Sequence, residues 1–167
     1  MEFRKAAESD VIRIMEIIRQ AQEYLKNCGI NQWQNNYPNA DTVLNDISKE
    51  YAYVLEKDGM VVGTVAVAFD GERTYDTIYE GEWLGESQYA VIHRIAVESG
   101  QKGSGIASEI IGEIEEICLS RDVHSIRVDT HRGNKPMQKL LLKNGFQYCG
   151  IIYLADQSER IAYEKLI

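Results

Sequence analysis

The sequence contains no apolar run of 18 residues, the length that a membrane-spanning helix requires. Its N-terminus carries acidic residues where a secretory signal peptide needs an apolar stretch. Basic residues are also in deficit, because 18 Lys and Arg face 26 Asp and Glu, which gives a formal net charge of −8. A surface that binds nucleic acid or anionic lipid needs an excess of positive charge. We therefore expect a soluble, cytoplasmic protein with no nucleic-acid partner and no membrane partner.

Cysteine and proline are scarce as well. An odd number of cysteines without a CxxC pair predicts reduced thiols rather than a disulfide framework or a zinc knuckle: Cys28, Cys118 and Cys149. His124 and His131 lack the spacing of metal ligands and no HExxH motif is present, so we expect no metal site. Two prolines, no internal repeat and no linker-like stretch predict one domain over residues 1–167.

Apolar periodicity and turn residues predict seven strands and four helices. The strands are expected around residues 3–4, 51–57, 60–69, 89–97, 125–130, 147–153 and 160–166. The helices are expected over 11–25, where Ser9 and Asp10 can act as caps, through 43–47 after caps at 39–41, over 106–117 and over 134–144. Asp58 and Gly59 form the turn of a hairpin. This order of elements describes a mixed α/β sheet.

A glycine cluster separates the predicted strand 89–97 from the helix that begins near Ile106. Gly103 and Gly105 allow backbone amides to approach a ligand, and a helix N-terminus adds partial positive charge, so phosphate is expected to bind there. An ordinary turn that contains glycine is the alternative. No GxxxxGK[ST] motif is present, and Ser108 occupies the third glycine position of a dinucleotide fingerprint. A nucleotide-dependent kinase or dehydrogenase is therefore the weaker interpretation.

The segments IHRIAV, GQKGSGIA and RVDTHRGNKPMQKLLLKNGF together resemble the GNAT family of N-acetyltransferases, over almost the whole chain. The resemblance implies a mostly antiparallel central sheet flanked by the four helices, with acetyl-CoA as co-substrate. In that family a loop [RQ]xxGx[GA] holds the pyrophosphate by its backbone amides. The implied cofactor contacts are Gln101, Lys102, Gly103, Ser104, Gly105, Ile106 and Ala107. Gly100 departs from the family, which usually has Arg or Gln at that position.

The strand before this loop carries the other implied contacts. The resemblance implies that Ile95, Ala96 and Val97 pair with the pantetheine arm, and that the amide of Ala96 or Val97 polarises the thioester carbonyl. His93 suits a general base, because imidazole titrates near neutrality; a hydrogen-bonded sheet histidine is the alternative. Strand alternation predicts that His93 and Ile95 share a face. Asn134 matches the family's cofactor-contacting asparagine, or it is simply a helix cap.

The family's usual general acid is missing. A tyrosine is expected in the helix that follows Asn134, and Leu141 occupies that position. Either the thiolate of CoA leaves unaided, because a thiol has a pKa near about 8.5, or another hydroxyl serves. The candidate hydroxyls are those of Tyr89, Tyr148 and Tyr153.

Charge is distributed unevenly along the chain. Residues 70–88 hold six acids and one base, whereas residues 124–145 hold five bases and one acid. The acidic segment, which also carries aromatic side chains, predicts a site for a cationic acceptor that includes Glu82 and Trp83; a solvated acidic loop is the alternative. Trp33 and Tyr37, between the first two helices, are further candidates for the acceptor site, unless they pack on the sheet or on a partner subunit.

Taken together, these patterns predict an acetyl-CoA-dependent N-acetyltransferase. It would act on a primary amine of a cationic small molecule or a peptide, by direct attack within a ternary complex. An O-acyltransferase on the same fold, a non-catalytic acyl-CoA-binding sensor and a nucleotide-binding α/β domain are the alternatives. Dimers are common in the resembled family, which makes a homodimer an option.

Overall fold

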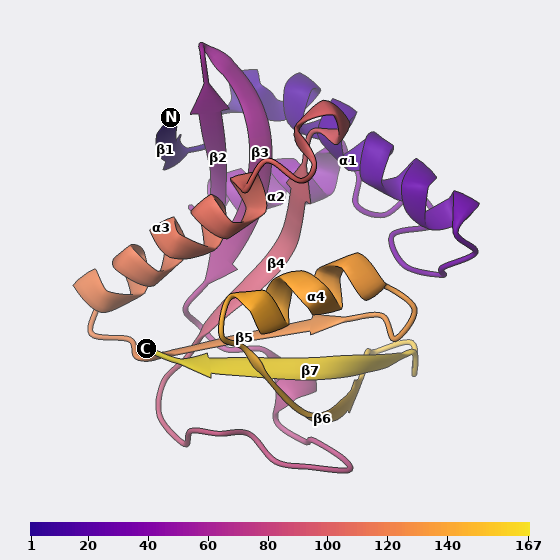
Figure 1. Ribbon diagram of the computed structural model, residues 1–167, viewed down its shortest axis with the longest axis vertical. Helices are drawn as coiled ribbons and strands as arrows, with labels where there is room; N and C mark the ends of the chain where they lie inside the picture. Colours follow the sequence, from indigo (N-terminus) through magenta and orange to yellow (C-terminus); the bar gives the residue numbers. More distant parts are fainter. The chain divides into compact units, whose positions relative to one another are not determined.

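The computed structural model describes residues 1–167 as seven strands and four α-helices (Figure 1). The strands are β1 (Glu2–Lys5), β2 (Ala52–Lys57), β3 (Met60–Ala68), β4 (Ala90–Val97), β5 (Ser125–Thr130), β6 (Gln147–Tyr153) and β7 (Glu159–Leu166). The helices are α1 (Val11–Asn27), α2 (Ala40–Ser48), α3 (Ile106–Ser120) and α4 (Lys135–Lys143). The element order is the predicted one.

The strands form one sheet in the order β1-β2-β3-β4-β5-β7-β6. The pairs β1–β2, β2–β3, β5–β7 and β6–β7 are antiparallel, whereas β4 and β5 run parallel. Parallel neighbours need a long crossover connection, and the chain between β4 and β5 supplies it with α3. The predicted mixed, mostly antiparallel sheet is confirmed.

The chain divides into two compact units, and each unit is assembled from two stretches of sequence. The first unit takes residues 1–67 and 93–113, and the second takes residues 68–92 and 114–167. Strand β4 contributes to both, because its last part begins the second stretch of the first unit at His93. The single domain expected over residues 1–167 stays a prediction.

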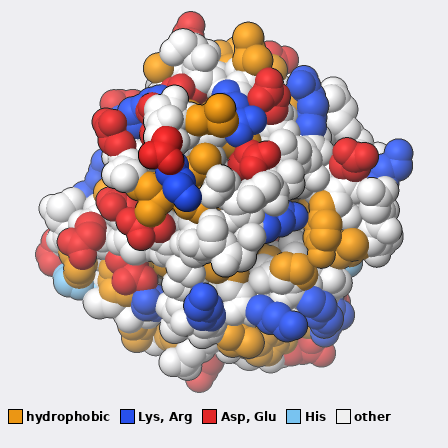
Figure 2. Space-filling view, turned by 45° about the horizontal axis from the view of Figure 1, so that its top comes forward, with side chains coloured by type: hydrophobic (Ala, Val, Ile, Leu, Met, Phe, Trp, Pro, Cys, Tyr) orange, Lys and Arg blue, Asp and Glu red, His pale blue; other side chains and the backbone are white.

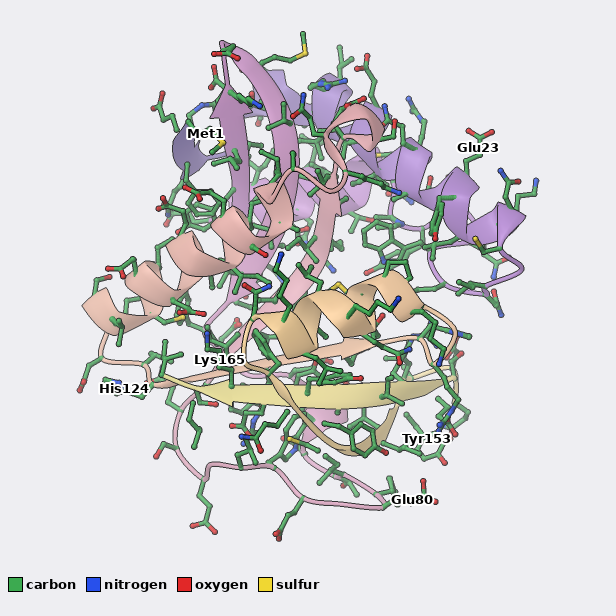
Figure 3. All side chains as sticks on the ribbon, viewed as in Figure 1. Met1, Glu23, Glu80, His124, Tyr153 and Lys165 are labelled. Carbon is green, nitrogen blue, oxygen red and sulfur yellow. The ribbon has the colours of Figure 1, made fainter.

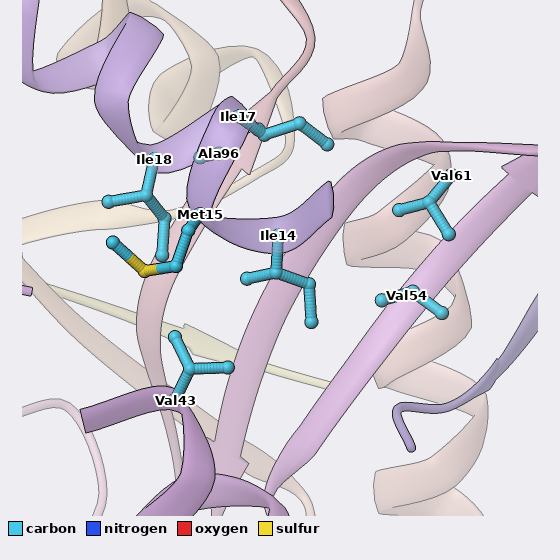
Figure 4. Packing of buried hydrophobic residues seen from close by; sticks show 8 residues of the cluster. All are labelled: Ile14, Met15, Ile17, Ile18, Val43, Val54, Val61 and Ala96. Carbon is cyan, nitrogen blue, oxygen red and sulfur yellow. The ribbon is translucent and has the colours of Figure 1, made fainter. Parts of the chain in front are cut away.

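In the first unit, an apolar core forms between the helices α1 and α2 and the strands. Its buried members, drawn in Figure 4, are Ile14, Met15, Ile17, Ile18, Val43, Val54, Val61 and Ala96. The helical spacing of the four α1 residues gives that helix one apolar face, which is why it packs here. The Asp58–Gly59 turn joins β2 to β3 with both residues in the left-handed region, as the predicted hairpin requires. Ala96 belongs to this core, so the end of β4 is fixed to it.

The cap predicted for α1 is wrong in one respect. Asp10 precedes the helix but makes no side-chain cap to it. Its carboxylate instead accepts a hydrogen bond from the Ala7 amide at 2.7 Å and two from the Arg4 guanidinium at 2.8 and 3.0 Å. Asp10 has helical backbone as the last residue of a 3-10 turn over Glu8–Asp10, so its carboxylate bonds back to Ala7 and to Arg4 of β1 rather than forward to α1. The cap at Asn39 is confirmed, because its side chain accepts from the Thr42 amide at 3.0 Å.

In the second unit, the strands β5, β7 and β6 form an antiparallel ladder, and the segment 69–89 without long regular structure lies against it. Tyr79 forms a two-hydrogen-bond bridge with Ile151 of β6, both at 2.8 Å. Tyr75 is buried with residues of β4, β6 and β7 in a second apolar cluster. Tyr153, labelled in Figure 3 on β6, places its ring 5.3 Å from that of Tyr79. The acidic segment is therefore attached to the sheet rather than free of it.

Most acidic side chains of that segment are nevertheless exposed. Glu80, labelled in Figure 3, extends from it into solvent, and Glu82 is exposed as well. Over the face seen in Figure 2, Asp and Glu side chains are interspersed with Lys and Arg.

The structure contains no helix that is both long enough and apolar enough to cross a membrane.

Candidate functional site

The turn between β4 and α3 has the backbone geometry that the glycines predict. Gly103 and Gly105 both adopt left-handed conformations, with φ of 80° and 88°, and α3 begins at Ile106. A Cβ atom at either glycine would meet no other atom within 4 Å, so the space beside the turn is open. The first four amides of an α-helix have no partner within the helix. The turn can thus receive an anionic group against the N-terminus of α3.

The start of this turn is tied to α1. The Gln20 side chain accepts a hydrogen bond from the Ser99 amide at 2.8 Å and donates one to Glu98 at 3.2 Å. Glu98 in turn accepts from the Gly100 amide at 2.7 Å. A Cβ atom at Gly100 would lie 2.9 Å from the same Glu98 oxygen. A side chain at position 100 would therefore require the Glu98 carboxylate to move away from the Gly100 amide.

Gln101 and Lys102 follow Gly100 and could contact a phosphate in place of the Arg or Gln that the family usually has at position 100. Both side chains are held within the first unit. The Lys102 ammonium lies 4.1 Å from the centre of the Tyr24 ring, in a cation–π contact with α1. The Gln101 side chain accepts a hydrogen bond from Lys57 at 3.4 Å. Lys102 is exposed, so its charge lies at the surface beside the open turn.

Strand β4 is continuous from Ala90 to Val97, but its regular conformation is interrupted at Arg94, between the predicted base and the predicted cofactor residues. Arg94 adopts a left-handed conformation with φ of 52°. Such a residue breaks the alternation of side chains along a strand, as in a β-bulge. We predicted that His93 and Ile95 share one face because side chains alternate along a regular strand. Arg94 breaks that alternation between them, so the prediction no longer follows. His93, Ile95 and Val97 are each partly buried, whereas Ala96 is buried in the core of Figure 4.

Arg94 also makes an ion pair with the shortest N–O distance among those of the first unit. Its guanidinium donates to both carboxylate oxygens of Asp46 in α2, at 2.7 and 2.6 Å. A third bond reaches the Tyr37 hydroxyl at 3.0 Å. Burial opposes the charge on Arg94, but the hydrogen bonds to Asp46 and the nearby Tyr37 outweigh it and raise the pKa of the guanidinium above its usual value.

The two aromatic candidates of the α1–α2 segment have different environments. Trp33 is partly buried and packs against the core cluster that contains Ala96. Tyr37 has its hydroxyl on Arg94 but leaves 44% of its surface exposed. Tyr37 is therefore better placed than Trp33 to contact a ligand, while Trp33 helps to fix the end of β4.

In the second unit, Trp83 is engaged by the chain itself. The Arg127 guanidinium lies 4.2 Å from the centre of its ring and 4.0 Å from that of Tyr89. The indole N–H donates to the Tyr75 carbonyl at 2.9 Å. One cation thus already occupies a face of Trp83, and Glu82 is the exposed member of the predicted pair.

Asn134 acts as the cap of α4, with its side chain accepting from the Met137 amide at 3.3 Å. His131, just before it, accepts from the Gly133 amide at Nδ1, and burial together with the nearby Arg160 lowers the pKa of its imidazole.

Leu141, at the position where the family usually has a tyrosine, is 0% exposed and forms part of the interior. Of the alternative hydroxyls, Tyr148 and Tyr153 are exposed on β6, and that of Tyr89 accepts from the Glu72 amide at 3.2 Å.

Three residues with notable contacts were not predicted as site residues from the sequence: Asp46, Arg94 and Asp129. Tyr75, one of the aromatic residues of the acidic segment expected to line the acceptor site, is instead 1% exposed and packed in an apolar cluster. The His93–Arg94 dipeptide inside an otherwise apolar strand was the one available signal for Arg94. The others depend on partners far away in the sequence. Tyr75 donates a hydrogen bond to Asp129 over a separation of 54 residues.

The sequence profile of the Acetyltransferase (GNAT) family matches residues 18–146. A solved acetyltransferase of the GNAT family from Streptococcus agalactiae is 35% identical, with a TM-score of 0.90 over 99% of this chain and 95% of that one. The PaiA N-acetyltransferase from Thermoplasma acidophilum, solved in complex with coenzyme A, shares the fold at 17% identity. Its TM-score is 0.75 over 99% of this chain and 98% of that one.

A curated relative, the S-alkylcysteine N-acetyltransferase of Bacillus subtilis, is 24% identical over 117 residues. The matched region is 70% of this chain and 60% of the relative. This chain therefore spans less than two thirds of the length of that enzyme.

Proposed function

The chain belongs to the Acetyltransferase (GNAT) family, and we propose that it transfers the acetyl group of acetyl-CoA to a primary amine. The observation that supports this most is the turn at Gly103 and Gly105. It has left-handed backbone, open space on one side and the N-terminus of α3 directly behind it. A pyrophosphate matches such a turn, because backbone amides and the helix dipole both favour negative charge. The family match includes β4, this turn and Asn134.

The cofactor contacts follow from the chain's own elements. Backbone groups of residues 101–107 hold the phosphates, and the backbone of Ile95–Val97 pairs with the pantetheine arm as an added strand would. Lys102, exposed beside the turn, supplies positive charge. Asn134 caps α4 with its side-chain oxygen, and its contact with the cofactor stays a prediction from the resemblance.

The proposed reaction is a direct transfer. The free amine attacks the thioester carbonyl carbon, a new C–N bond forms, and the C–S bond breaks to release CoA as a thiolate. The amide of Ala96 or Val97 donates a hydrogen bond to the oxyanion of the intermediate. Holding amine and thioester in one complex replaces a bimolecular encounter with a unimolecular step, which supplies much of the rate.

Proton transfer involves fewer groups than is usual for the resembled family. His93 removes the proton from the ammonium so that the amine can attack. Leu141 is fully buried and has no proton to donate, so either the CoA thiolate leaves unaided or another hydroxyl serves as the acid. Burial raises the pKa of the Cys118 and Cys149 thiols to about 11, which keeps them protonated and disfavours a covalent acyl-cysteine route.

The acceptor is proposed to be a cationic small molecule or a peptide amine. Exposed acids such as Glu80 and Glu82 raise the local concentration of cations near the segment that carries them. The Bacillus subtilis relative is named for an S-alkylcysteine, so amino acids with a thioether belong in the set of acceptors to test.

The test is product formation. The full chain is incubated with acetyl-CoA and a panel of polyamines, peptides, aminoglycosides and S-alkylcysteines, while released CoA thiol and the mass of the product are measured. We expect thiol release with at least one amine and a product heavier by one acetyl group that resists hydroxylamine. An ester, which hydroxylamine cleaves, would favour an O-acyltransferase instead.

A second candidate is a non-catalytic acyl-CoA-binding sensor, which the fully buried Leu141 favours. Tight binding of acetyl-CoA without thiol release in the presence of any amine or alcohol would support the sensor and contradict the transferase. Failure to bind acetyl-CoA would contradict both.

A further inference from the structure

The contact between Arg94 and Asp46 lies at the interruption of β4. Arg94 is the residue of that strand with a left-handed backbone, and it stands between His93 and Ile95. A conformation that is sparsely populated for a non-glycine residue persists only where the surrounding contacts hold it. The contacts of the Arg94 side chain therefore stabilise this conformation.

Those contacts form a bidentate, largely buried ion pair. The Asp46 side chain is 6% exposed and that of Arg94 is 16% exposed, with both carboxylate oxygens bonded to the guanidinium. A planar guanidinium that bonds two oxygens is fixed in direction as well as in distance. Because Asp46 neutralises the charge, Arg94 is not a receptor for a carboxylate on the acceptor.

The third hydrogen bond of Arg94 fixes a residue of the segment between α1 and α2. The remaining guanidinium nitrogen donates to the Tyr37 hydroxyl at 3.0 Å. The segment is also bonded to α1 on both sides of Tyr37. The Gln22 side chain donates to the Pro38 carbonyl, and the Gln34 side chain donates to the Gln22 carbonyl, both at 3.0 Å. The Tyr37 ring, held at both ends, still exposes 44% of its surface. A fixed aromatic ring with an exposed face is suited to an apolar or cationic group.

We propose that the Arg94–Asp46 ion pair is a positioning device that couples β4 to the acceptor side of the site. It holds the interruption between His93 and Ile95, and it holds Tyr37 as the platform for the part of the acceptor that does not react. This inference rests on the proposed acetyltransferase function. Arg94 and Asp46 are positioning residues, and Tyr37 is the residue that touches the acceptor.

The test compares Asp46→Asn, Arg94→Lys and Tyr37→Phe with a matched control, Asp10→Asn. Asp10 and Arg4 form a similar bidentate pair in the same unit, with the Asp10 side chain 11% exposed, but they join β1 to the start of α1. Two readouts are needed. Hydrogen–deuterium exchange of residues 30–39 reports the anchoring, and separate KM values for acceptor and acetyl-CoA report the function.

We expect Asp46→Asn to speed exchange of residues 30–39 at least tenfold and to raise the acceptor KM about tenfold or more, with the acetyl-CoA KM within twofold of wild type. Arg94→Lys retains the positive charge but cannot bond both carboxylate oxygens, so its exchange rate and acceptor KM should change less than those of Asp46→Asn. Tyr37→Phe removes only the hydroxyl, so it should raise the acceptor KM less and leave the fold intact. Asp10→Asn should change neither readout.

Unchanged exchange and an unchanged acceptor KM in Asp46→Asn and Tyr37→Phe would overturn the inference, as would equal effects in Asp10→Asn. If Asp46→Asn does not fold, Tyr37→Phe alone decides between the two outcomes. Wild-type protein that acetylates no acceptor would count against the proposed function, whereas the exchange comparison would still confirm or overturn the anchoring.

Discussion

The Tyr75 hydroxyl donates a hydrogen bond of 2.7 Å to the Asp129 carboxylate and so ties the segment between β3 and β4 to the end of β5. Tyr75 is 1% exposed, and burial is the main reason why the pKa of its phenol is well above the usual value. The pKa of Asp129 is also raised, because desolvation outweighs the hydrogen bond from Tyr75 and the attraction of Arg160.

A carboxyl group whose pKa is raised by folding makes stability depend on pH in a defined direction. The stability that this group contributes is fully present below its pKa in the unfolded chain, about 3.9. It is lost as the pH rises through the higher pKa of Asp129 in the folded protein. Asp129→Asn should remove this loss, so the variant should gain stability relative to wild type as the pH rises above about 4. Tyr75→Phe removes a contact that lowers the pKa of Asp129, so the loss should extend to higher pH and become larger than in wild type. The missing hydrogen bond itself should cost about 1–2 kcal/mol.

Urea unfolding of the three proteins between pH 4 and pH 8 measures these differences. A free energy of unfolding that changes in parallel for wild type and Asp129→Asn across this range would show that Asp129 does not titrate as described.

Glu164 of β7 bonds the acidic segment to the interior of the second unit. This buried carboxylate contacts Arg127 at 3.2 Å, accepts from the Leu84 amide at 2.6 Å and accepts from the Ser125 hydroxyl. Glu164→Ala would leave the Arg127 guanidinium buried without its counter-ion. We expect a loss of about 3–5 kcal/mol in the free energy of unfolding.

The control is Glu159→Ala, which breaks the exposed contact of Glu159 with Arg132 and should change stability little. Equal stabilities of the two variants in a urea titration would argue against the role of Glu164 as an internal anchor.

His93 is the subject of the third prediction. If it is the general base, His93→Ala should lower kcat/KM about 10²- to 10⁴-fold and abolish the acid limb of the pH–rate profile. His124→Ala is the control, because that imidazole is exposed and pairs with Asp122. The acid limb is the decisive readout: if it persists unchanged in His93→Ala, another group removes the proton.

Local patterns were sufficient to predict the elements of the fold. The spacing of apolar residues in α1 and the Asp58–Gly59 turn act over a few residues, so the helix and the hairpin follow from sequence alone. The glycine turn before α3 is equally local, since left-handed backbone at Gly103 and Gly105 is a property of the residue type.

Long-range pairings could not be predicted in this way. The ion pair of Arg94 with Asp46 joins residues 48 apart, and the Arg127 guanidinium meets Trp83 only because β5 and the segment 69–89 come together in the fold. The left-handed backbone of Arg94 is a consequence of such contacts rather than of its own preference. For the same reason Asp10, a good cap by composition, bonds to Arg4 instead.

The most direct test of the central claim is a calorimetric titration of acetyl-CoA into wild type, Gly105→Ala and Gly59→Ala. Both glycines have left-handed φ, 88° and 76°, and a Cβ at either meets no protein atom within 4 Å, so the backbone strain of the two substitutions is matched. Only Gly105 lies in the turn that we propose as the pyrophosphate site. We predict binding to wild type and to Gly59→Ala, with at least tenfold weaker binding to Gly105→Ala. Equal affinity in all three proteins, or no binding to wild type, would contradict the claim.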